Sequence, residues 1–352
     1  MMRSQDNTWL HRFALFTAAS TLCLIWLGGL VTSHGAGMAV PDWPTTYGYN
    51  MFFFPVSRWV GGIFYEHSHR LVASGIGFLT VILAVWLWLK EERSWLRRLG
   101  YIALFAVVLQ GVLGGLRVTQ MKDVIGVFHA TLAQIFFALL CSIALFTSRR
   151  WRAYSDAQTP VCGTGTIRYA LAVATGMILV QLVIGATMRH QHAGLAIPDF
   201  PSAYGKFWPA MDSDSVVRYN QARGEATATN LITGFQIAVQ MVHRIMALII
   251  LMSVAWIAGS VRRRQPGTML SKGALAWFGL IIVQAGLGAF TIWSNKAADV
   301  ATAHVAIGAL SLMTGVLLTI LAGARKENST LKPGVKNSAA SRAARGSHQV
   351  PA

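Results

Sequence analysis

The sequence predicts an all-α integral membrane protein, with eight transmembrane helices arranged as two tandem four-helix bundles. Three observations support this fold class. Hydrophobic residues make up 54% of the 352 residues and charged residues only 12%, which is too little charge to surround a soluble core of this size. Eight apolar stretches have the length of about 20 residues that crosses a bilayer. The chain also repeats itself, and the repeat divides these stretches into two sets of four.

The eight predicted spans are continuously apolar, whereas a half-buried strand would alternate. In lipid they must be helices, because every backbone polar group has to be satisfied within its own segment. The first stretch exceeds a signal-peptide core and lacks a small-residue cleavage site, so we interpret it as a span. The spans run near 13–33, 67–89, 99–119, 125–147, 167–188, 233–259, 273–293 and 301–323.

The net charge of +17 arises from 30 Lys and Arg against 13 Asp and Glu. A basic chain of this kind suggests nucleic acid, but the positive residues cluster in short runs between apolar segments, so no nucleic-acid site is predicted. With the N-terminus in the cytoplasm, about 20 of the positive residues lie inside, which is the positive-inside pattern. An even number of spans then places the C-terminus in the cytoplasm as well. The three cysteines form no CxxC or CxxCH motif, which excludes a thiol redox pair and covalent haem attachment.

The internal repeat is clearest in the outer loops. Residues 36–44 (AGMAVPDWP) recur as 193–201 (AGLAIPDFP), 157 residues later. His69-Arg70 recurs as His243-Arg244 at an offset of 174 residues, and His129 recurs as His304 at 175. We therefore predict a cytoplasmic N-terminus (1–12), an N-terminal four-helix half (13–150), a C-terminal half (151–323) and a disordered cytoplasmic tail (324–352).

Four histidines lie at matching depths in the predicted helices. His69, His129, His243 and His304 each precede the next cytoplasmic charge by 19 to 21 residues, which is about 30 Å of helix. Histidines inside membrane helices are costly and are functional candidates. Two histidines on facing helices at one level suit bis-axial ligation of haem iron in an apolar slot. Zinc is less favoured, because neither half adds further ligands of the usual type.

The remaining outer histidines carry a weaker signal. His67 lies two residues from His69 and points to a different helix face, so we predict that it is not a ligand. His34, His190 and His192 fall in predicted external loops, where they could touch a ligand's edge or a metal, but solvated side chains are favoured. No role follows for these four histidines from the sequence.

Glu66 breaks the repeat, because Gln240 stands at the equivalent position. It precedes His69 by three residues and lies on roughly the same helix face. A carboxylate at an apolar boundary has a raised pKa and can act as a general base or proton relay. Chemistry is therefore predicted in the first half and a fixed cofactor in the second. The alternative is a carboxylate that is favoured at a helix start by the helix dipole.

Other repeated features have two interpretations each. Arg70 and Arg244 could pair with haem propionates or extend to the outer interface. The Pro-Asp-aromatic-Pro loops could fold back as lids or form tight turns. Glycines at Gly28-Gly29, Gly114-Gly115, Gly185 and Gly288 favour close helix packing over ligand contact.

Together, these residues resemble the haem A synthase family over about 13–323. The resemblance rests on eight helices in two halves, the Glu66-His67-Ser68-His69-Arg70 stretch, the Gln-plus-Gly ends of the third and seventh spans, and histidines on the even spans. It implies an oxidoreductase that converts haem O to haem A for terminal oxidases, by oxidising the C8 methyl group to a formyl group. It also implies that the protein lies in the bacterial cytoplasmic (inner) membrane.

The resemblance also assigns the site residues. His69 and His129 would bind the substrate haem O, His243 and His304 would bind a haem b cofactor, and Glu66 would be the essential glutamate. The implied partners are haem O, haem O synthase, membrane lipid and an electron acceptor or donor, and a homo-oligomer is compatible with the sequence. This chain lacks the outer-loop cysteine pair of some family members, so a redox role for that pair does not apply.

Three other functions compete with this interpretation. A membrane dihaem b-type electron carrier fits four coplanar histidines equally well, and only the Glu66–Gln240 difference argues for porphyrin chemistry. A duplicated transporter predicts polar groups near the bilayer midplane, whereas these lie at the outer edge. A haem O synthase needs paired aspartate-rich motifs for Mg²⁺-diphosphate, and none is present.

Overall fold

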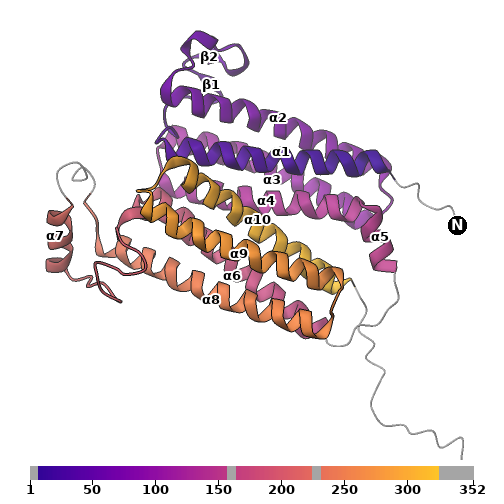
Figure 1. The fold of residues 1–352 in the computed structure, drawn as a ribbon. Helices are drawn as coiled ribbons and strands as arrows, with labels where there is room; N and C mark the ends of the chain where they lie inside the picture. The colour runs from indigo at the N-terminus through magenta and orange to yellow at the C-terminus, as the bar shows by residue number, and fades with distance from the viewer. Residues whose placement is uncertain (1–6, 157–163, 224–230, 325–352) are drawn as a thin grey trace, which may run out of the picture.

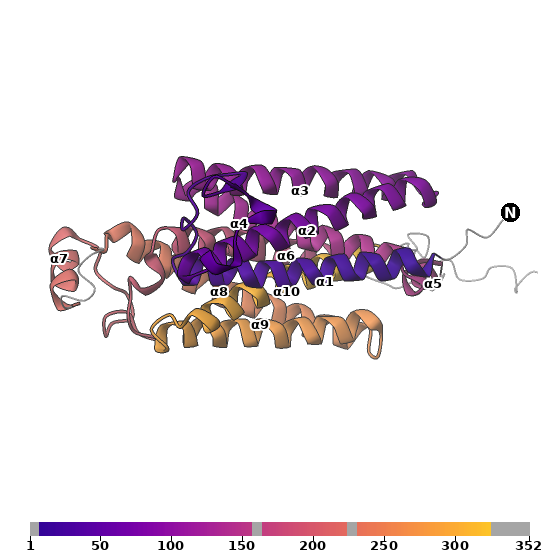
Figure 2. The same cartoon turned by 90° about the horizontal axis from the view of Figure 1, so that it is seen from above.

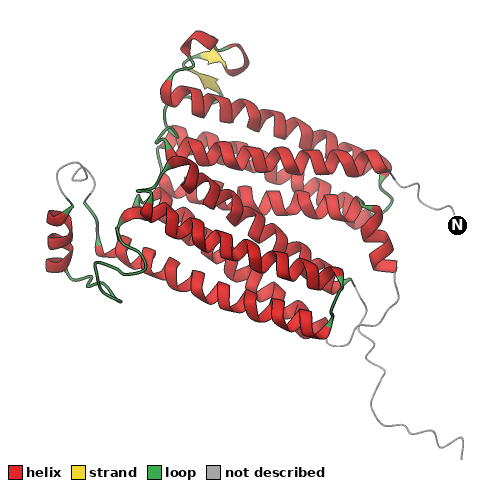
Figure 3. Ribbon diagram, viewed as in Figure 1, coloured by secondary structure: helices red, strands yellow, loops and turns green. Residues whose placement is uncertain are grey.

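The computed structural model describes residues 7–156, 164–223 and 231–324. Within these residues, eight helices are long and apolar enough to cross a membrane, so the prediction of an all-α membrane protein with eight spans is confirmed (Figure 3). They are α1 (Thr8–Ser33), α2 (Gly61–Lys90), α3 (Ser94–Gln120), α4 (Asp123–Thr147), α6 (Thr164–His190), α8 (Gly234–Arg264), α9 (Met269–Trp293) and α10 (Ala298–Gly323).

The helices extend beyond the predicted apolar cores because polar residues cap them. The Asn7 side chain accepts a hydrogen bond from the Leu10 N–H at the start of α1, so this helix includes part of the segment predicted as the N-terminus. Thr233 and Gln236 form a capping box at the start of α8. The same helix continues through Arg262, Arg263 and Arg264, where positive charge is favoured by the helix dipole.

The helices form two rings of four, one in each half of the chain. In the first ring α1 packs on α2 and α4, and α3 packs on both of these helices. In the second ring α6 and α9 each pack on both α8 and α10. The helices α2 and α4 are therefore diagonal partners across the first bundle, as α8 and α10 are across the second.

The two bundles meet through their inner helices. α1 and α4 of the first half contact α10, and α4 also contacts α6. Figures 1 and 2 show these four helices between the outer pairs, with α3 and α9 on opposite sides of the molecule. The outward faces are apolar: Phe16, Phe78, Phe105 and Leu248 are each more than half exposed. Such helix faces suit lipid rather than water.

Several short elements were not predicted. The first outer loop contains an antiparallel hairpin of β1 (Thr45–Thr46) and β2 (Tyr49–Asn50) and two 3-10 turns, η1 (Met51–Phe53) and η2 (Val56–Arg58). The second contains η3 (Ala193–Leu195) and α7 (Ser213–Ala222). The helix α5 (Arg149–Asp156) spans the boundary predicted between 150 and 151. The predicted tail lies outside the described residues from 325 onward.

Each outer loop contains its own copy of the same hydrogen-bonded turn. Both copies lie at the end of the molecule opposite α5 (Figure 1). In the first loop the Asp42 carboxylate accepts hydrogen bonds from the Thr45 hydroxyl and from the backbone N–H groups of Tyr47 and Gly48. Asp199 makes the equivalent three bonds in the second loop, to Ser202, Tyr204 and Gly205.

The Tyr-Gly pair of each turn has left-handed backbone, with φ of 48° at Tyr47 and 76° at Gly48, and 54° and 71° at Tyr204 and Gly205. This conformation favours glycine at the second position. The sequence repeat is therefore also a structural repeat.

Candidate functional site

Two of the four predicted histidines face each other in the second bundle. His243 on α8 and His304 on α10 come from diagonal helices, and their ring centroids are 6.4 Å apart with an interplanar angle of 60°. Both side chains are half-buried. The Nδ1 atom of each ring is buried and has no hydrogen-bond partner. A buried polar atom without a partner is unusual and calls for a ligand or another explanation.

This spacing suits a metal ion between the rings. Two metal–imidazole bonds of about 2 Å, plus about 1 Å from each nitrogen to its ring centre, separate the centroids by about 6 Å. Among the described residues, no group of three or more His, Cys, Asp or Glu side chains comes together. The two facing imidazoles match the number of protein ligands that bis-axial ligation of haem iron uses. The residues fit a bis-histidine haem.

The first bundle repeats the arrangement with α2 and α4. His69 and His129 lie close enough to interact electrostatically across the bundle. His129 also has a buried Nδ1 atom without a hydrogen-bond partner. The two halves therefore each bring one histidine pair together near the outer helix ends.

A glycine supports each of the four histidine rings, and each glycine belongs to the long helix that precedes its histidine. A Cβ atom at Gly28 would lie 3.1 Å from Nε2 of His69, and one at Gly288 would lie 3.2 Å from Cε1 of His304. The corresponding distances are 3.4 Å for Gly114 and His129, and 3.3 Å for Gly185 and His243. The glycines that the sequence assigned to helix packing thus define where the imidazoles lie.

Two glutamine side chains donate hydrogen bonds to the backbone carbonyl groups of site histidines. Gln110 donates to the backbone carbonyl of His129 at 3.1 Å, and Gln181 donates to that of His243 at 2.9 Å. Gln110 belongs to the Gln-plus-Gly end of the third span and has Gln284 as its repeat partner, whereas Gln181 has no sequence signal because Leu24 occupies the equivalent position.

Glu66 and Gln240 perform the same structural task in their two halves. The Glu66 Oε2 atom accepts a hydrogen bond from the Val40 N–H at 2.9 Å, and the Gln240 Oε1 atom accepts one from the Ile197 N–H at 2.7 Å. Both side chains are buried. The other Glu66 oxygen forms an ion pair with Arg70 at 2.7 Å. Both residues thus attach the repeated outer loop to its helix.

Arg70 and Arg244 also bind the loops. Arg70 donates to the backbone carbonyls of Val40, Asp42 and Thr45 as well as to Glu66. Arg244 donates to the carbonyls of Asp199 and Ser202. The Nη groups of both arginines bind the loops, whereas the Nε atom of Arg244 is buried without a hydrogen-bond partner. Loop attachment is therefore established, and a contact with haem propionates stays a prediction.

The two loops fold back onto the outer ends of the bundles. The Trp43 ring packs directly on α3, where any Cβ atom at Gly115 would overlap it. Phe200 packs edge-on against Trp293 of α9, with ring centroids 6.0 Å apart, and the Trp293 indole N–H donates to the Phe200 carbonyl. Each Pro-Asp-aromatic-Pro segment is therefore both a tight turn and a cover for its bundle.

The other outer histidines differ from one another. His67 is fully buried beside Phe54 and Trp59, and its Nδ1 atom lies 3.2 Å from the Thr46 hydroxyl, so it packs against the first loop. His34 and His192 are exposed. The expectation of a solvated His190 is wrong: it ends α6, is only 6% exposed, and packs where a side chain at Gly126 of α4 would overlap it.

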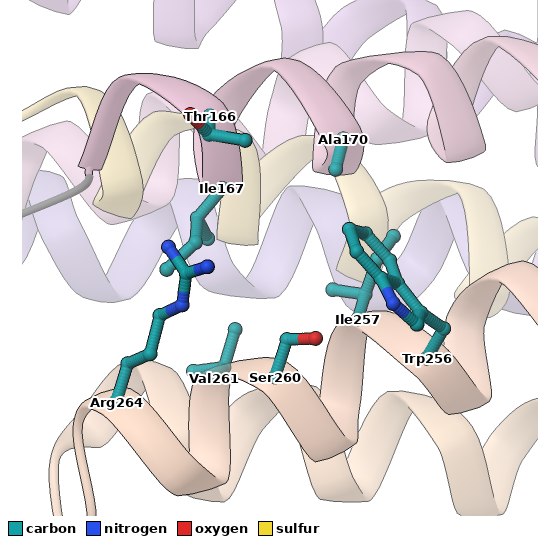
Figure 4. A pocket seen from close by; sticks show the side chains of 8 residues that line it. All are labelled: Thr166, Ile167, Ala170, Trp256, Ile257, Ser260, Val261 and Arg264. Atoms are coloured by element: carbon teal, nitrogen blue, oxygen red, sulfur yellow. The ribbon is translucent and has the colours of Figure 1, made fainter.

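Two pockets of different size lie between α6 and α8, one near each end of these helices. An apolar cavity of about 310 Å³ lies near the outer end, and Val183, Thr187 and Val242 are among its lining residues. Val242 directly precedes His243. The pocket in Figure 4 lies at the opposite end, between Thr166 of α6 and Ser260 and Arg264 of α8. Its volume of about 20 Å³ holds about one water molecule. The outer pocket is larger but open, because Phe235 and Val242 in its lining are exposed.

The fold and the paired histidines define a class: a multi-pass α-helical membrane protein with one histidine pair in each of two repeated halves. A family model described as cytochrome oxidase assembly protein matches residues 11–316. The chain belongs to this family. The resemblance to haem A synthases is also confirmed by its relatives.

Relatives that carry the name heme A synthase include those of three bacteria. The protein of Geobacillus kaustophilus is 27% identical over 326 residues, which cover 87% of this chain and 89% of the relative. That of Lysinibacillus sphaericus is 25% identical over 317 residues, covering 89% and 94%. That of Symbiobacterium thermophilum is 30% identical over 224 residues, covering 61% and 70%.

Proposed function

We propose that this protein is a haem A synthase, an oxidoreductase that converts the C8 methyl group of haem O to a formyl group by successive hydroxylation and loss of water. The family and the names of the relatives support this function. The observation that carries it is the facing pair His243 and His304, whose geometry fits axial ligation of haem. The electron-carrier alternative is not favoured, because the relatives are named as synthases.

Within this function the two halves have different tasks. His243 and His304 hold haem b, which supplies one-electron redox chemistry when it is bound. His69 and His129 hold the substrate haem O in the first bundle, and the glycines behind the rings determine their depth. The loop over each bundle limits access of water from the outer side. Each pair of imidazoles thus positions a porphyrin in an apolar slot.

Glu66 is the proposed catalytic residue, although its contacts also give it a structural task. It lies one turn before His69 and interacts electrostatically with Arg117, as both histidines of the first pair do. It is therefore on the side of the substrate site. The second half shows that a glutamine at this position still attaches the loop, which offers a way to separate the two tasks.

Glu66→Gln should preserve loop attachment, haem b content and haem O binding, yet stop haem A formation, because the amide accepts the Val40 hydrogen bond but cannot carry a proton as a carboxylate does. Glu66→Ala should lose loop attachment as well. Haem products are measured by extraction and mass spectrometry, and loop attachment by hydrogen exchange over 36–48. Normal haem A formation by Glu66→Gln would restrict Glu66 to loop attachment.

The reaction also defines partners and location. Haem O must arrive from a haem O synthase within the membrane, and an electron partner must accept the electrons that leave the methyl carbon. We place the protein in the bacterial cytoplasmic membrane, with both termini in the cytoplasm. The apolar outer surface fits lipid and leaves room for a homo-oligomer.

The first test is haem extraction from the purified protein after expression with a source of haem O. Haem b together with haem O, haem A or a hydroxylated intermediate supports the synthase. Haem b alone, in spite of available haem O, would favour the electron carrier.

A further inference from the structure

Three positive side chains gather at the outer end of the molecule, where the two bundles meet. Arg117 lies in the last turn of α3, Arg189 in the last turn of α6, and Lys296 in the turn between α9 and α10. The two arginines break the internal repeat, because threonines, Thr291 and Thr32, occupy the equivalent positions. The two arginines are therefore not required by the structure that the two halves have in common.

Arg117 lies near the first histidine pair, His69 and His129. Its guanidinium lies against Gly37 of the outer loop, where a Cβ atom would come within 2.8 Å of both Nη atoms. Its Nε atom is buried and has no hydrogen-bond partner. The Arg117 charge interacts with both His69 and His129. A donor is thus held beside the first pair without a protein acceptor.

Arg189 lies on α6 of the second bundle, but its side chain reaches α1 of the first bundle. Its Nη2 group donates to the Gly29 carbonyl and to the Ser33 hydroxyl, both on α1. Its charge interacts with His304 and with Arg117. Burial, and after it the charge of Arg189, lower the pKa of Lys296 below its usual range.

Among the described residues, no carboxylate lies within 4 Å of the charged nitrogens of these three side chains. Asp123 and Glu66 interact with Arg117, but Glu66 is already paired with Arg70. In the described part of the chain, none of the three cations forms an ion pair. Positive charge withdrawn from water without a counter-charge is costly. The cluster therefore favours an anionic ligand next to the two apolar histidine sites.

We propose that Arg117 and Arg189 bind the propionate carboxylates of the two porphyrins, Arg117 at the first histidine pair and Arg189 at the second. A porphyrin carries its carboxylates on one edge, so an apolar slot with cations at its outer end would fix its orientation. Guanidinium binds carboxylate through two parallel hydrogen bonds. This inference rests on the proposed function, because it requires that each pair binds a haem.

The test compares iron protoporphyrin IX with its dimethyl ester, in which both propionates are esterified. Each compound is titrated into the full-length apoprotein in detergent, and bis-histidine absorbance bands report binding. In the wild type, esterification should weaken binding by roughly ten- to hundredfold, the usual contribution of a charged hydrogen bond. Arg117→Gln and Arg189→Gln should each bind the acid more weakly and reduce the difference between acid and ester.

Two further variants make the test specific. Arg117→Lys and Arg189→Lys keep the charge and should restore most of the preference for the acid. Arg58→Gln removes an exposed arginine on the same side and should behave as the wild type. An undiminished preference in both glutamine variants would overturn the inference and leave the proposed function intact. Absence of bis-histidine bands in the wild type would instead refute haem binding, and the inference with it.

Discussion

Among single residues, the two facing histidines of the second bundle allow the most direct test of haem binding. Replacing His243 or His304 by Ala removes one axial ligand, so we expect loss of bound haem b from either variant. Haem per protein is measured by the pyridine haemochromogen method after purification. His192→Ala is the matched control, because His192 is exposed on the same side. Full haem b content in both ligand variants would contradict the assignment.

The glycines behind the rings allow a sharper comparison. Gly288 and Gly286 lie two residues apart on α9, but only a Cβ at Gly288 would press on His304, and nothing lies within 4 Å of one at Gly286. Replacing either glycine by Ala stabilises the helix by about 1 kcal/mol, so this contribution is the same in the two variants. We expect Gly288→Ala to weaken haem b binding roughly ten- to hundredfold, as supporting residues of metal ligands do, and Gly286→Ala to leave it unchanged. Equal affinities, measured by haem titration, would exclude a role for the glycine.

At the scale of the element, an aspartate organises each outer loop. Burial alone would raise the pKa of Asp42, but hydrogen bonds from Gly48, Thr45 and Tyr47 lower it below its usual range. Asp199 has the same balance and the same direction. A lowered pKa means that the carboxylate stabilises the folded turn above the ordinary Asp pKa of about 3.9. The stabilisation is lost as the pH falls through the lower pKa of the folded state.

We therefore expect Asp42→Ala to expose the first turn while the second stays closed. Hydrogen exchange at Tyr47 and Gly48 should accelerate at least about tenfold, since several bonds to a charged acceptor are lost. The Tyr204 and Gly205 amides report the intact loop in the same sample. In the wild type, both turns should lose protection, corrected for intrinsic exchange, only below about pH 4. Unchanged exchange in the variant would show that other contacts hold the turn.

At the scale of the whole molecule, orientation follows from the placement of positive charge. We expect the long outer loops to face away from the cytoplasm. In a chain whose native cysteines are replaced by serine, Phe207→Cys should react with a membrane-impermeant maleimide in intact cells, whereas Glu92→Cys should be protected. Both positions are exposed. A reporter fused after Arg325, beyond the described residues, should be cytoplasmic, and the reverse labelling pattern would invert the topology.

Part of the candidate site was accessible from the sequence because its signals are local. Hydrophobic length predicts the spans, and the repeat predicts which histidines correspond, since both depend on neighbouring residues or on direct comparison of segments. Arg117 was accessible in principle, as a charge inside the predicted span 99–119. Its meaning depends on Arg189, which comes from the other half and becomes its neighbour only when α1, α4, α6 and α10 pack together.

The sequence by itself determined that this chain is an eight-span, duplicated membrane protein with four histidines at one depth. Only the tertiary structure decided that His243 and His304 face each other, that a glycine supports each ring, and that Glu66 attaches a loop. The physical reason is that hydrophobicity and periodicity act within a segment. Ring spacing, hydrogen-bond partners and the gathering of charge instead depend on contacts between segments far apart in the chain.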